Sequence, residues 1–348
     1  MKDYDILVFI GRFQPLHIGH EAVINYALER AERVILLVGS SNRARSPRNP
    51  WTFAERLTMI RSTFHWEVEN KKLEIFPLPD YLYNDNAWLT KVRDIISFSE
   101  EHAVGRSKTA IIGYQKDRST YYLGMLCDYE IVAWDKQPTF NSTEIRDDYF
   151  RFSPRLPEIC NKHVKIFMVD FWDTVHYEWL VREHQFNYEY KRSWKIAPYP
   201  PTIMTVDPVV IQNGHVLLVT RGEFPGKGLL AFPGGHVDQD EFLIDAVVRE
   251  LKEETTIADS KGSIPPAILK SFITKRETFD DPHRSERGRV ITHAYLFELP
   301  TSAFGLYPVK GGSDARTAKW YPISDIKGPM MFEDHFFIMT KMLGLTID

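Results

Sequence analysis

Residues 5–20 have the sequence DILVFIGRFQPLHIGH, and this stretch decides the fold of the N-terminal half. Its first part, 5–11, is an apolar run typical of a strand buried on both faces of a parallel sheet. Similar runs follow at 33–39, 73–78, 109–113 and 129–134, with helix-like segments between them at 19–31, 52–64, 87–98 and 119–126. This alternation predicts right-handed βαβ units in an α/β domain with a doubly wound parallel sheet.

The length of 348 residues fits about two domains of ordinary size. A mostly helical stretch at 144–190 is rich in aromatic residues, and the segment 191–201 ends in APYPP. Prolines disfavour both a helix and a central strand, so this segment is typical of a semi-rigid linker. We therefore predict a first domain at 1–190, a linker at 191–201 and a second domain at 202–348.

The pattern changes after this linker. Two short strand-like runs are joined by Asn213-Gly214, a two-residue hairpin signal. A clear helix is expected at 241–254, and the remaining expected elements are strands at 269–274 and 289–299 and a final helix at 333–343. This order predicts an α+β fold for the second domain.

Composition narrows the functional classes. Apolar residues make up 43% and charged residues 26% of the chain, the balance of a globular protein. A net charge of −4 argues against nucleic acid as a partner. Cys127 and Cys160 cannot form a disulfide framework, which suits a reducing cytoplasm. The sequence indicates no export signal and no membrane span, and it leaves the oligomeric state open.

The first motif, GxFxPxHxGH, follows the first strand and opens the first helix. It consists of six residues: Gly11, Phe13, Pro15, His17, Gly19 and His20. The carboxyl end of a strand in an open α/β sheet is where ligands bind, and a helix start offers free N–H groups to phosphate oxygens. The two histidines lie three residues apart, on one side of the helix start. They can donate hydrogen bonds to oxygens whose charge grows as pyrophosphate leaves.

This motif resembles the signature of the nucleotidyltransferase superfamily, which implies a Rossmann-like domain that binds ATP. The superfamily's second motif, Ser-x-Thr-x-x-Arg, is matched at Thr143 and Arg146, with Asn141 in place of the usual serine. By this resemblance Thr143 and Arg146 hold the β and γ phosphates of ATP. An arginine suits this role because its planar guanidinium grips phosphate through several donors.

The acceptor of the AMP is suggested by the segment PDYLYNDNAW at 79–88. It resembles the segment that holds nicotinamide in archaeal-type nicotinamide mononucleotide adenylyltransferases. The candidate nicotinamide mononucleotide-binding residues are Asp80, Asn84, Asn86 and Trp88. A tryptophan face attracts a pyridinium cation, and an asparagine amide can bond a carboxamide. Pantetheine phosphate and flavin mononucleotide remain alternative acceptors.

The second half contains the Nudix pattern Gx5Ex7REUxEExGU, where U is a bulky aliphatic residue. The matching residues are Gly235, Glu241, Arg249, Glu250, Leu251, Glu253, Glu254 and Ile257. On a helix Glu250, Glu253 and Glu254 share one face, which repels itself unless hard divalent cations such as Mg²⁺ or Mn²⁺ neutralise it. Thr256 replaces the family glycine that commonly ends this helix, so the sequence does not fix the backbone conformation at this position.

The segment 279–290 resembles a loop and strand of ADP-ribose pyrophosphatases, which makes Arg284 and Arg287 candidate ADP-ribose ligands beside Gly235. Taken together, both halves resemble the bifunctional nicotinamide mononucleotide adenylyltransferase and Nudix ADP-ribose pyrophosphatase proteins of bacteria. The resemblance implies synthesis of NAD from ATP, and cleavage of ADP-ribose to AMP and ribose 5-phosphate. An alternative is that the second domain senses a nucleotide without hydrolysing it.

Overall fold

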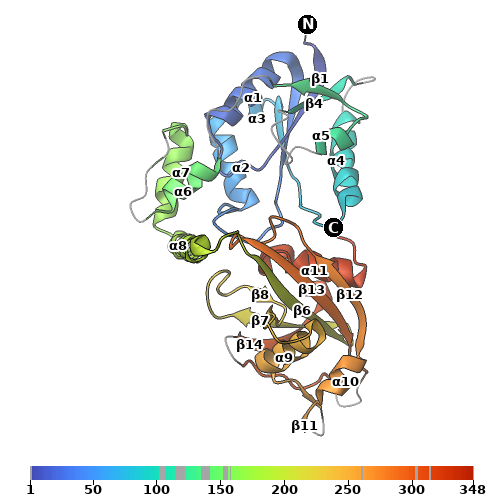
Figure 1. The fold of residues 1–348 in the computed structure, drawn as a ribbon. Helices are drawn as coiled ribbons and strands as arrows, with labels where there is room; N and C mark the ends of the chain where they lie inside the picture. Colours follow the sequence, from blue (N-terminus) through green and yellow to red (C-terminus); the bar gives the residue numbers. More distant parts are fainter. Residues whose placement is uncertain are drawn as a thin grey trace. The chain divides into compact units, whose positions relative to one another are not determined.

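The computed structural model describes residues 2–101, 107–113, 122–134, 142–151, 156, 158–259, 262–301, 305–312 and 315–347. The chain divides into two compact units, Met1–His184 and Gln185–Asp348 (Figure 1). Each unit is described by itself below. No helix in these described ranges is both long and apolar enough to cross a membrane.

The first unit is built on a parallel sheet. Its described strands are β1 (Tyr4–Gly11), β2 (Ala31–Val38), β3 (Leu73–Pro77), β4 (Thr109–Gly113) and β5 (Glu130–Ala133). They lie in the order β3-β2-β1-β4-β5, and each neighbouring pair is parallel. The predicted doubly wound sheet is confirmed. Because the strand order reverses at β1 and β4, the carboxyl ends of these two strands border the crevice where such sheets bind ligands.

Helices cover both faces of this sheet. The described helices are α1 (Ile18–Arg30), α2 (Phe53–Thr63), α3 (His65–Glu69), α4 (Asp85–Glu100), α5 (Tyr122–Met125), α6 (Ser142–Tyr149), α7 (Lys162–Trp172) and α8 (Val175–Ser193). Successive side chains of a strand point to opposite faces. Accordingly, Leu7 of β1 joins the core under α1, α2 and α7, whereas Ile6 and Val8 join the core under α4 and α5.

The second unit has a mixed sheet in the order β12-β13-β6-β7-β14, with β8 on β7 and β9 on β6. Its described strands are β6 (Thr202–Gln212), β7 (His215–Arg221), β8 (Leu230–Ala231), β9 (Gly235–His236), β12 (Ile273–Phe279), β13 (Arg289–Glu298) and β14 (Ala315–Pro322), and a separate pair joins β10 (Ala258–Asp259) to β11 (Gly262–Ser263). The β6–β13 pair is parallel, and the other pairs of this sheet are antiparallel. The predicted Asn213-Gly214 hairpin joins β6 to β7.

Three helices complete the second unit: α9 (Leu243–Thr255), α10 (Pro266–Ser271) and α11 (His335–Leu343), as far as the described residues show. Short 3₁₀ turns lie at Trp194–Ile196, Ile323–Asp325 and Gly328–Met330. The buried face of α9, including Val247 and Leu251, packs into the same core as Val206 and Phe297 of the sheet. Glu250 and Glu254 follow Val247 by three and seven residues, so they border this buried face of α9, and Glu254 is itself largely buried.

The structure corrects one predicted element. The expected strand at 269–274 is wrong, because helix α10 runs to Ser271 and strand β12 begins only at Ile273. The helix begins at Pro266, where the fixed proline φ suits the first helical position. Near the predicted linker, α8 continues to Ser193, and the division between the units falls after His184. The linker boundaries at 191–201 stay a prediction.

Candidate active sites

The loop after β1 is shaped by its two motif glycines. A Cβ on Gly11 would lie 3.0 Å from the ring of Phe13, and a Cβ on Gly19 would lie 3.0 Å from the ring of His17. Phe13 itself has a φ of 50°, a conformation that non-glycine residues seldom adopt. A side chain at Gly11 or Gly19 would therefore push the ring of Phe13 or His17 aside by a few tenths of an ångström, so the glycines favour the close placement of these two rings.

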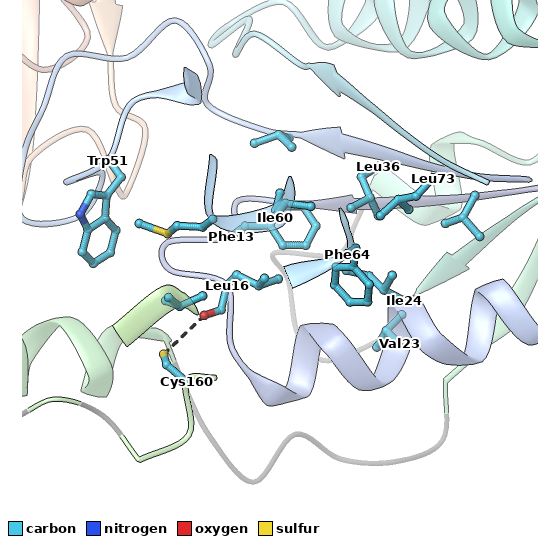
Figure 2. Packing of buried hydrophobic residues seen from close by; sticks show 14 of the residues in the cluster. Phe13, Leu16, Val23, Ile24, Leu36, Trp51, Ile60, Phe64, Leu73 and Cys160 are labelled. Atoms are coloured by element: carbon cyan, nitrogen blue, oxygen red, sulfur yellow. Dashed lines mark hydrogen bonds between the residues drawn. The ribbon is translucent and has the colours of Figure 1, made fainter. Parts of the chain in front are cut away.

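This loop is anchored in the core of the first unit. Figure 2 shows Phe13 and Leu16 packed among buried side chains that include Trp51 and Ile60. The Cys160 thiol donates a hydrogen bond of 3.4 Å to the carbonyl of Leu16. Burial raises the pKa of this thiol to about 12, so it stays protonated and keeps the bond. The anchoring fixes the backbone that presents both motif histidines.

His17 lies at the start of α1. Its Nδ1 accepts a hydrogen bond of 3.1 Å from the Gly19 amide, so in the neutral ring the proton belongs on Nε2. That nitrogen lies 3.2 Å from the Ser142 hydroxyl of α6. His17 therefore presents an N–H toward the second motif. At the same helix start the Ile18 amide donates to the Ile159 carbonyl at 2.9 Å, so this amide and that of Gly19 are already engaged.

His20 stacks on His17, with ring centroids 3.8 Å apart, and its ring also packs beside Phe13. Burial, and then the neighbouring His17, holds the pKa of His20 well below its usual value. Its Nδ1 is buried and has no hydrogen-bond partner among the described residues. A buried polar atom without a partner is costly, and it indicates a place for a ligand.

The second motif lies against the first, as the sequence predicts. Arg146 is 4% exposed, and its two terminal nitrogens donate to the Gln14 carbonyl at 2.8 Å and to the Thr143 hydroxyl at 3.2 Å. Asn141 lies outside the described residues. The structure adds Ser142, which sequence reasoning missed, although its place between Asn141 and Thr143 was a signal. His17, Ser142, Thr143 and Arg146 thus form one group.

The residues predicted to bind the acceptor have different surroundings in the structure. The Asp80 carboxylate accepts a bond of 3.1 Å from the Ser40 hydroxyl, and reciprocal bonds of 2.8 and 3.0 Å join its backbone to the Asn42 amide. Asp80 is therefore tied to the loop after β2, which lies next to the loop after β1 that carries the first motif. Asn84 caps α4 through a bond of 3.1 Å from the Ala87 amide.

Two further predicted acceptor residues lie in the first turn of α4. Asn86 is exposed, whereas Trp88 is partly buried and packs against the core under α4. Packing of this kind holds a tryptophan ring in place whether or not a ligand is present. Contact of Asp80, Asn84, Asn86 or Trp88 with nicotinamide mononucleotide stays a prediction.

In the second unit Arg249 joins the acidic side chains of the Nudix pattern. Its guanidinium makes a paired contact with Glu241, at 3.1 and 2.6 Å, and further bonds of 2.9 Å to Glu250 and 3.2 Å to Glu253. It also reaches the His236 carbonyl at 3.1 Å. The Arg249 hydrogen bond lowers the pKa of Glu241. Arg249 therefore aligns the carboxylates on the face of α9.

The glycine turn before α9 presses against two of these carboxylates. The Gly234 amide donates a hydrogen bond of 3.1 Å to Glu254, which is 9% exposed. A Cβ on Gly235 would lie 2.6 Å from a Glu250 oxygen. Gly234 has a φ of 154°, in the region that favours glycine. Glycine at both positions lets the backbone approach the carboxylates.

The donor chemistry fits a hard divalent cation, because Glu250, Glu253 and Glu254 offer only oxygen ligands. In the described part of the chain, no group of three or more His, Cys, Asp or Glu side chains is already gathered in a metal-binding arrangement. Two of the three glutamates instead contact Arg249. Their role as metal ligands stays a prediction.

Thr256 does not change the backbone at the end of α9. It has φ 41° and ψ 35°, which is the left-handed conformation expected of a glycine at this place. Its amide donates to the Lys252 carbonyl at 3.0 Å, and its hydroxyl donates to the Lys310 carbonyl at 3.0 Å. The second bond helps to stabilise a conformation that is unfavourable for threonine.

The two arginines of the loop after β12 have different surroundings. Arg284 is 4% exposed and makes two hydrogen bonds, of 2.8 and 2.9 Å, to Asp334. The guanidinium of Arg287 lies 3.7 Å from the Glu333 carboxylate. The pKa of His236 is lowered mainly by burial and to a smaller extent by the positive charge of Arg287. Arg287 is therefore near the residue that follows Gly235, whereas Arg284 is engaged in a buried ion pair.

Comparisons with known proteins agree with this arrangement. A family model described as cytidylyltransferase-like matches residues 8–147, and one described as a NUDIX domain matches residues 202–340. The chain is similar to a solved structure of a bifunctional NMN adenylyltransferase/ADP ribose pyrophosphatase from Francisella tularensis, complexed with AMP and a manganese ion. The identity is 35%, the TM-score is 0.89, and the match covers 98% of this chain and 99% of that one.

Each half also has separate relatives. Over 151 residues the chain is 33% identical to a nicotinamide/nicotinic acid mononucleotide adenylyltransferase of Acinetobacter baylyi, covering 43% of this chain and 78% of that protein. Over 141 residues it is 32% identical to an ADP-ribose pyrophosphatase of Methanocaldococcus jannaschii, covering 40% of this chain and 73% of that protein.

Proposed function

The chain belongs to the family of bifunctional NMN adenylyltransferase/ADP-ribose pyrophosphatase enzymes, and from this premise we propose how its two units act. The first unit transfers AMP from ATP to nicotinamide mononucleotide (NMN), giving NAD and pyrophosphate. The second hydrolyses ADP-ribose to AMP and ribose 5-phosphate. The observation that carries this proposal is the match to both halves of one bifunctional enzyme over 98% of the chain.

In the first reaction an oxygen of the NMN 5′-phosphate attacks the α-phosphorus of ATP in line. The new P–O bond forms as the bond to the β-phosphate oxygen breaks, and pyrophosphate leaves with the electron pair. We assign the N–H groups of His17 and His20 to the phosphate oxygens. Thr143 and Arg146 then hold the β and γ phosphates. These donors stabilise the charge that grows on the departing pyrophosphate.

The acceptor is positioned on the other side of the motif loop. Asp80 follows β3, and Ser40 and Asn42 hold it against the loop after β2. We propose that NMN binds there, with Trp88 and the asparagines of α4 near its nicotinamide end. Holding both substrates in one geometry removes most of the entropy cost of bringing them together.

In the second reaction a water oxygen attacks a phosphorus of the ADP-ribose diphosphate, and the P–O bond between the two halves breaks. Divalent metal dependence follows from the family, and we propose Mg²⁺ held by Glu250, Glu253 and Glu254. Such a cation lowers the pKa of water and neutralises diphosphate oxygens. Arg249 orients the glutamates, and Arg287 together with Gly235 borders the substrate. We further propose that the protein works in the cytoplasm.

Product identification tests this proposal against its alternatives. The purified chain is incubated with Mg·ATP and NMN, pantetheine phosphate or flavin mononucleotide, and separately with ADP-ribose and Mg²⁺ or Mn²⁺. We expect NAD from NMN, and AMP with ribose 5-phosphate from ADP-ribose. Bound ADP-ribose that is never cleaved with either metal would instead make the second unit a sensor.

A further inference from the structure

Arg56 of α2 is buried, although nothing in its sequence setting marks it as part of the site. It is 1% exposed. Its hydrogen bonds in the described residues all go to backbone carbonyls: Arg12 at 2.6 Å, Gly39 at 2.7 Å, Ser40 at 3.3 Å and Thr52 at 3.3 Å. Arg12 belongs to the loop after β1, and Gly39 and Ser40 to the loop after β2. One guanidinium thus joins two loops at the carboxyl edge of the sheet.

Burying a charged guanidinium costs free energy, which indicates that Arg56 has a specific role in the folded protein. Burial lowers the pKa of Arg56 to about 10, and no carboxylate in the described ranges forms an ion pair with it. The neighbouring Glu55 is paired with Arg45 instead. A buried charge is tolerated only when its donors are satisfied, and here carbonyl dipoles satisfy them.

The two joined loops also hold unfavourable backbone conformations. Phe13, which follows Arg12, has a φ of 50°, and Ser40 has a φ of 52°. Residues held in this region are strained, persist where their surroundings fix them, and gather at active sites. Arg56 bonds the carbonyl just before one of these residues and the carbonyl of the other. Its hydrogen bonds therefore help to fix both conformations.

The two loops that Arg56 joins carry or contact the residues assigned to ATP and to the acceptor. The loop after β1 carries Phe13 and His17 of the first motif. On the other side, the Ser40 hydroxyl donates to the Asp80 carboxylate, which we assign to the NMN side. Arg56 thus lies between the residues assigned to ATP and those assigned to the acceptor. Its described hydrogen bonds go to backbone carbonyls, and the charge of the Asp80 carboxylate favours its protonated form.

We propose that Arg56 is a positioning residue for adenylyl transfer, which holds the ATP loop and the acceptor loop in the register that in-line attack requires. This inference rests on the proposed function of the first unit. A displacement of about 1 Å between reacting groups can lower a rate by about a hundredfold. Loss of Arg56 should therefore lower kcat more than it raises KM for either substrate.

The chain offers a matched control in Arg33. Arg33 lies near the amino end of β2, and its side chain is 22% exposed, so it is less buried than Arg56. It donates hydrogen bonds of 3.0 Å to Glu74 and 2.8 Å to the Ser99 carbonyl. It stabilises the same sheet away from the carboxyl edge. A purely structural role for Arg56 would make the two arginines behave alike.

The test compares full-length Arg56→Gln, Arg56→Lys and Arg33→Gln with the wild type, measuring kcat, both KM values, the thermal midpoint and ADP-ribose hydrolysis. We expect Arg56→Gln to lose about tenfold to a hundredfold in kcat with KM for ATP within about threefold. Arg56→Lys should retain more activity, because its ammonium keeps some of the carbonyl bonds. Arg33→Gln should keep kcat within about twofold, and hydrolysis should persist in all three.

The outcomes separate the inference from the proposed function. A wild-type chain that makes no NAD refutes the proposed function and this inference with it. If the wild type is active, kcat of Arg56→Gln within twofold of it, or an equal loss in Arg33→Gln, overturns the inference alone. Should Arg56→Gln not fold, Arg56→Lys compared with Arg33→Lys decides, and an equal kcat in these two variants rejects the positioning role.

Discussion

His20 acts in this account as a neutral hydrogen-bond donor. Its pKa is held well below the usual histidine value, first by burial and then by His17, so the ring carries no charge near neutral pH. A neutral imidazole has one N–H to offer. No residue that the structure describes pairs with its buried Nδ1, so in this account the ring completes its hydrogen bonding when substrate binds.

We predict that His20→Ala loses about 10²–10³-fold in the rate of NAD synthesis, the usual cost of removing one donor to a developing oxyanion. ADP-ribose hydrolysis by the same preparation should be unchanged. The exposed His65 of the same unit provides the control, since His65→Ala should keep synthesis at the wild-type rate. Synthesis within twofold of wild type in His20→Ala would remove His20 from the site.

Glu254→Gln tests the second site. The amide oxygen of glutamine can still accept the Gly234 hydrogen bond, so the turn is kept while the negative charge is lost. We expect metal-dependent ADP-ribose cleavage to fall by about a hundredfold or more, with NAD synthesis intact. Glu223→Gln, at an exposed carboxylate of the same unit, should have no effect. Comparable cleavage in Glu254→Gln and wild type at saturating Mg²⁺ contradicts the assignment.

The motif residues could be assigned to candidate sites from the sequence because each motif is defined by short spacings along the chain. The family resemblance assigned both motifs to ATP, and in the structure they meet where His17 lies 3.2 Å from Ser142 and Arg146 donates to the Gln14 carbonyl. The surroundings of Arg284 could not be predicted. Its partner Asp334 lies 50 residues along the chain, and no local pattern announces the pair. Arg56 was missed for the same reason, because its partners are backbone carbonyls.

At the scale of elements, long periodic segments were the most predictable. Buried parallel strands need continuous apolar runs, so the strands of the first unit were visible in sequence. The segment 269–274 was mistaken for a strand because a short apolar run does not distinguish a buried helix from a strand. Strand β14, with the sequence ARTAKWYP, lacks a simple alternation and was not predicted.

The start of α11 gives a pH-dependent prediction. His335 is buried there, and its Nδ1 accepts a hydrogen bond of 3.0 Å from the Phe232 amide, just before the glycine turn. Burial lowers the pKa of His335 from its usual value near 6.5. Below that pH the unfolded chain binds a proton that the folded chain does not, so stability must fall as pH falls.

We therefore expect the thermal midpoint of the second unit to drop between pH 7.5 and 5.5, by less in His335→Gln than in wild type. One such proton changes the unfolding free energy by at most about 1.4 kcal/mol per pH unit. His283→Gln, at an exposed histidine of the same unit, should behave like wild type. The same pH shift in His335→Gln and wild type would show that His335 is not the titrating group.

At the scale of the whole molecule, the sequence predicted two domains because the strand pattern changes after the proline-rich segment. The structure divides the chain into Met1–His184 and Gln185–Asp348, and the residues assigned to each reaction come from one unit. The exact boundary could not be predicted, since α8 continues through the division without a break in its helical pattern. The central claim is that each unit carries a complete reaction centre.

Dividing the chain after Lys195 tests this claim most directly, because the cut leaves α8 whole on the N-terminal piece. The two pieces are expressed separately, checked for folding by circular dichroism and assayed for both reactions. The account predicts that 1–195 makes NAD with a kcat/KM close to that of the full chain, and that 196–348 cleaves ADP-ribose equally well. A folded piece that loses more than about tenfold in kcat/KM, or about 1.4 kcal/mol of transition-state stabilisation, would contradict it.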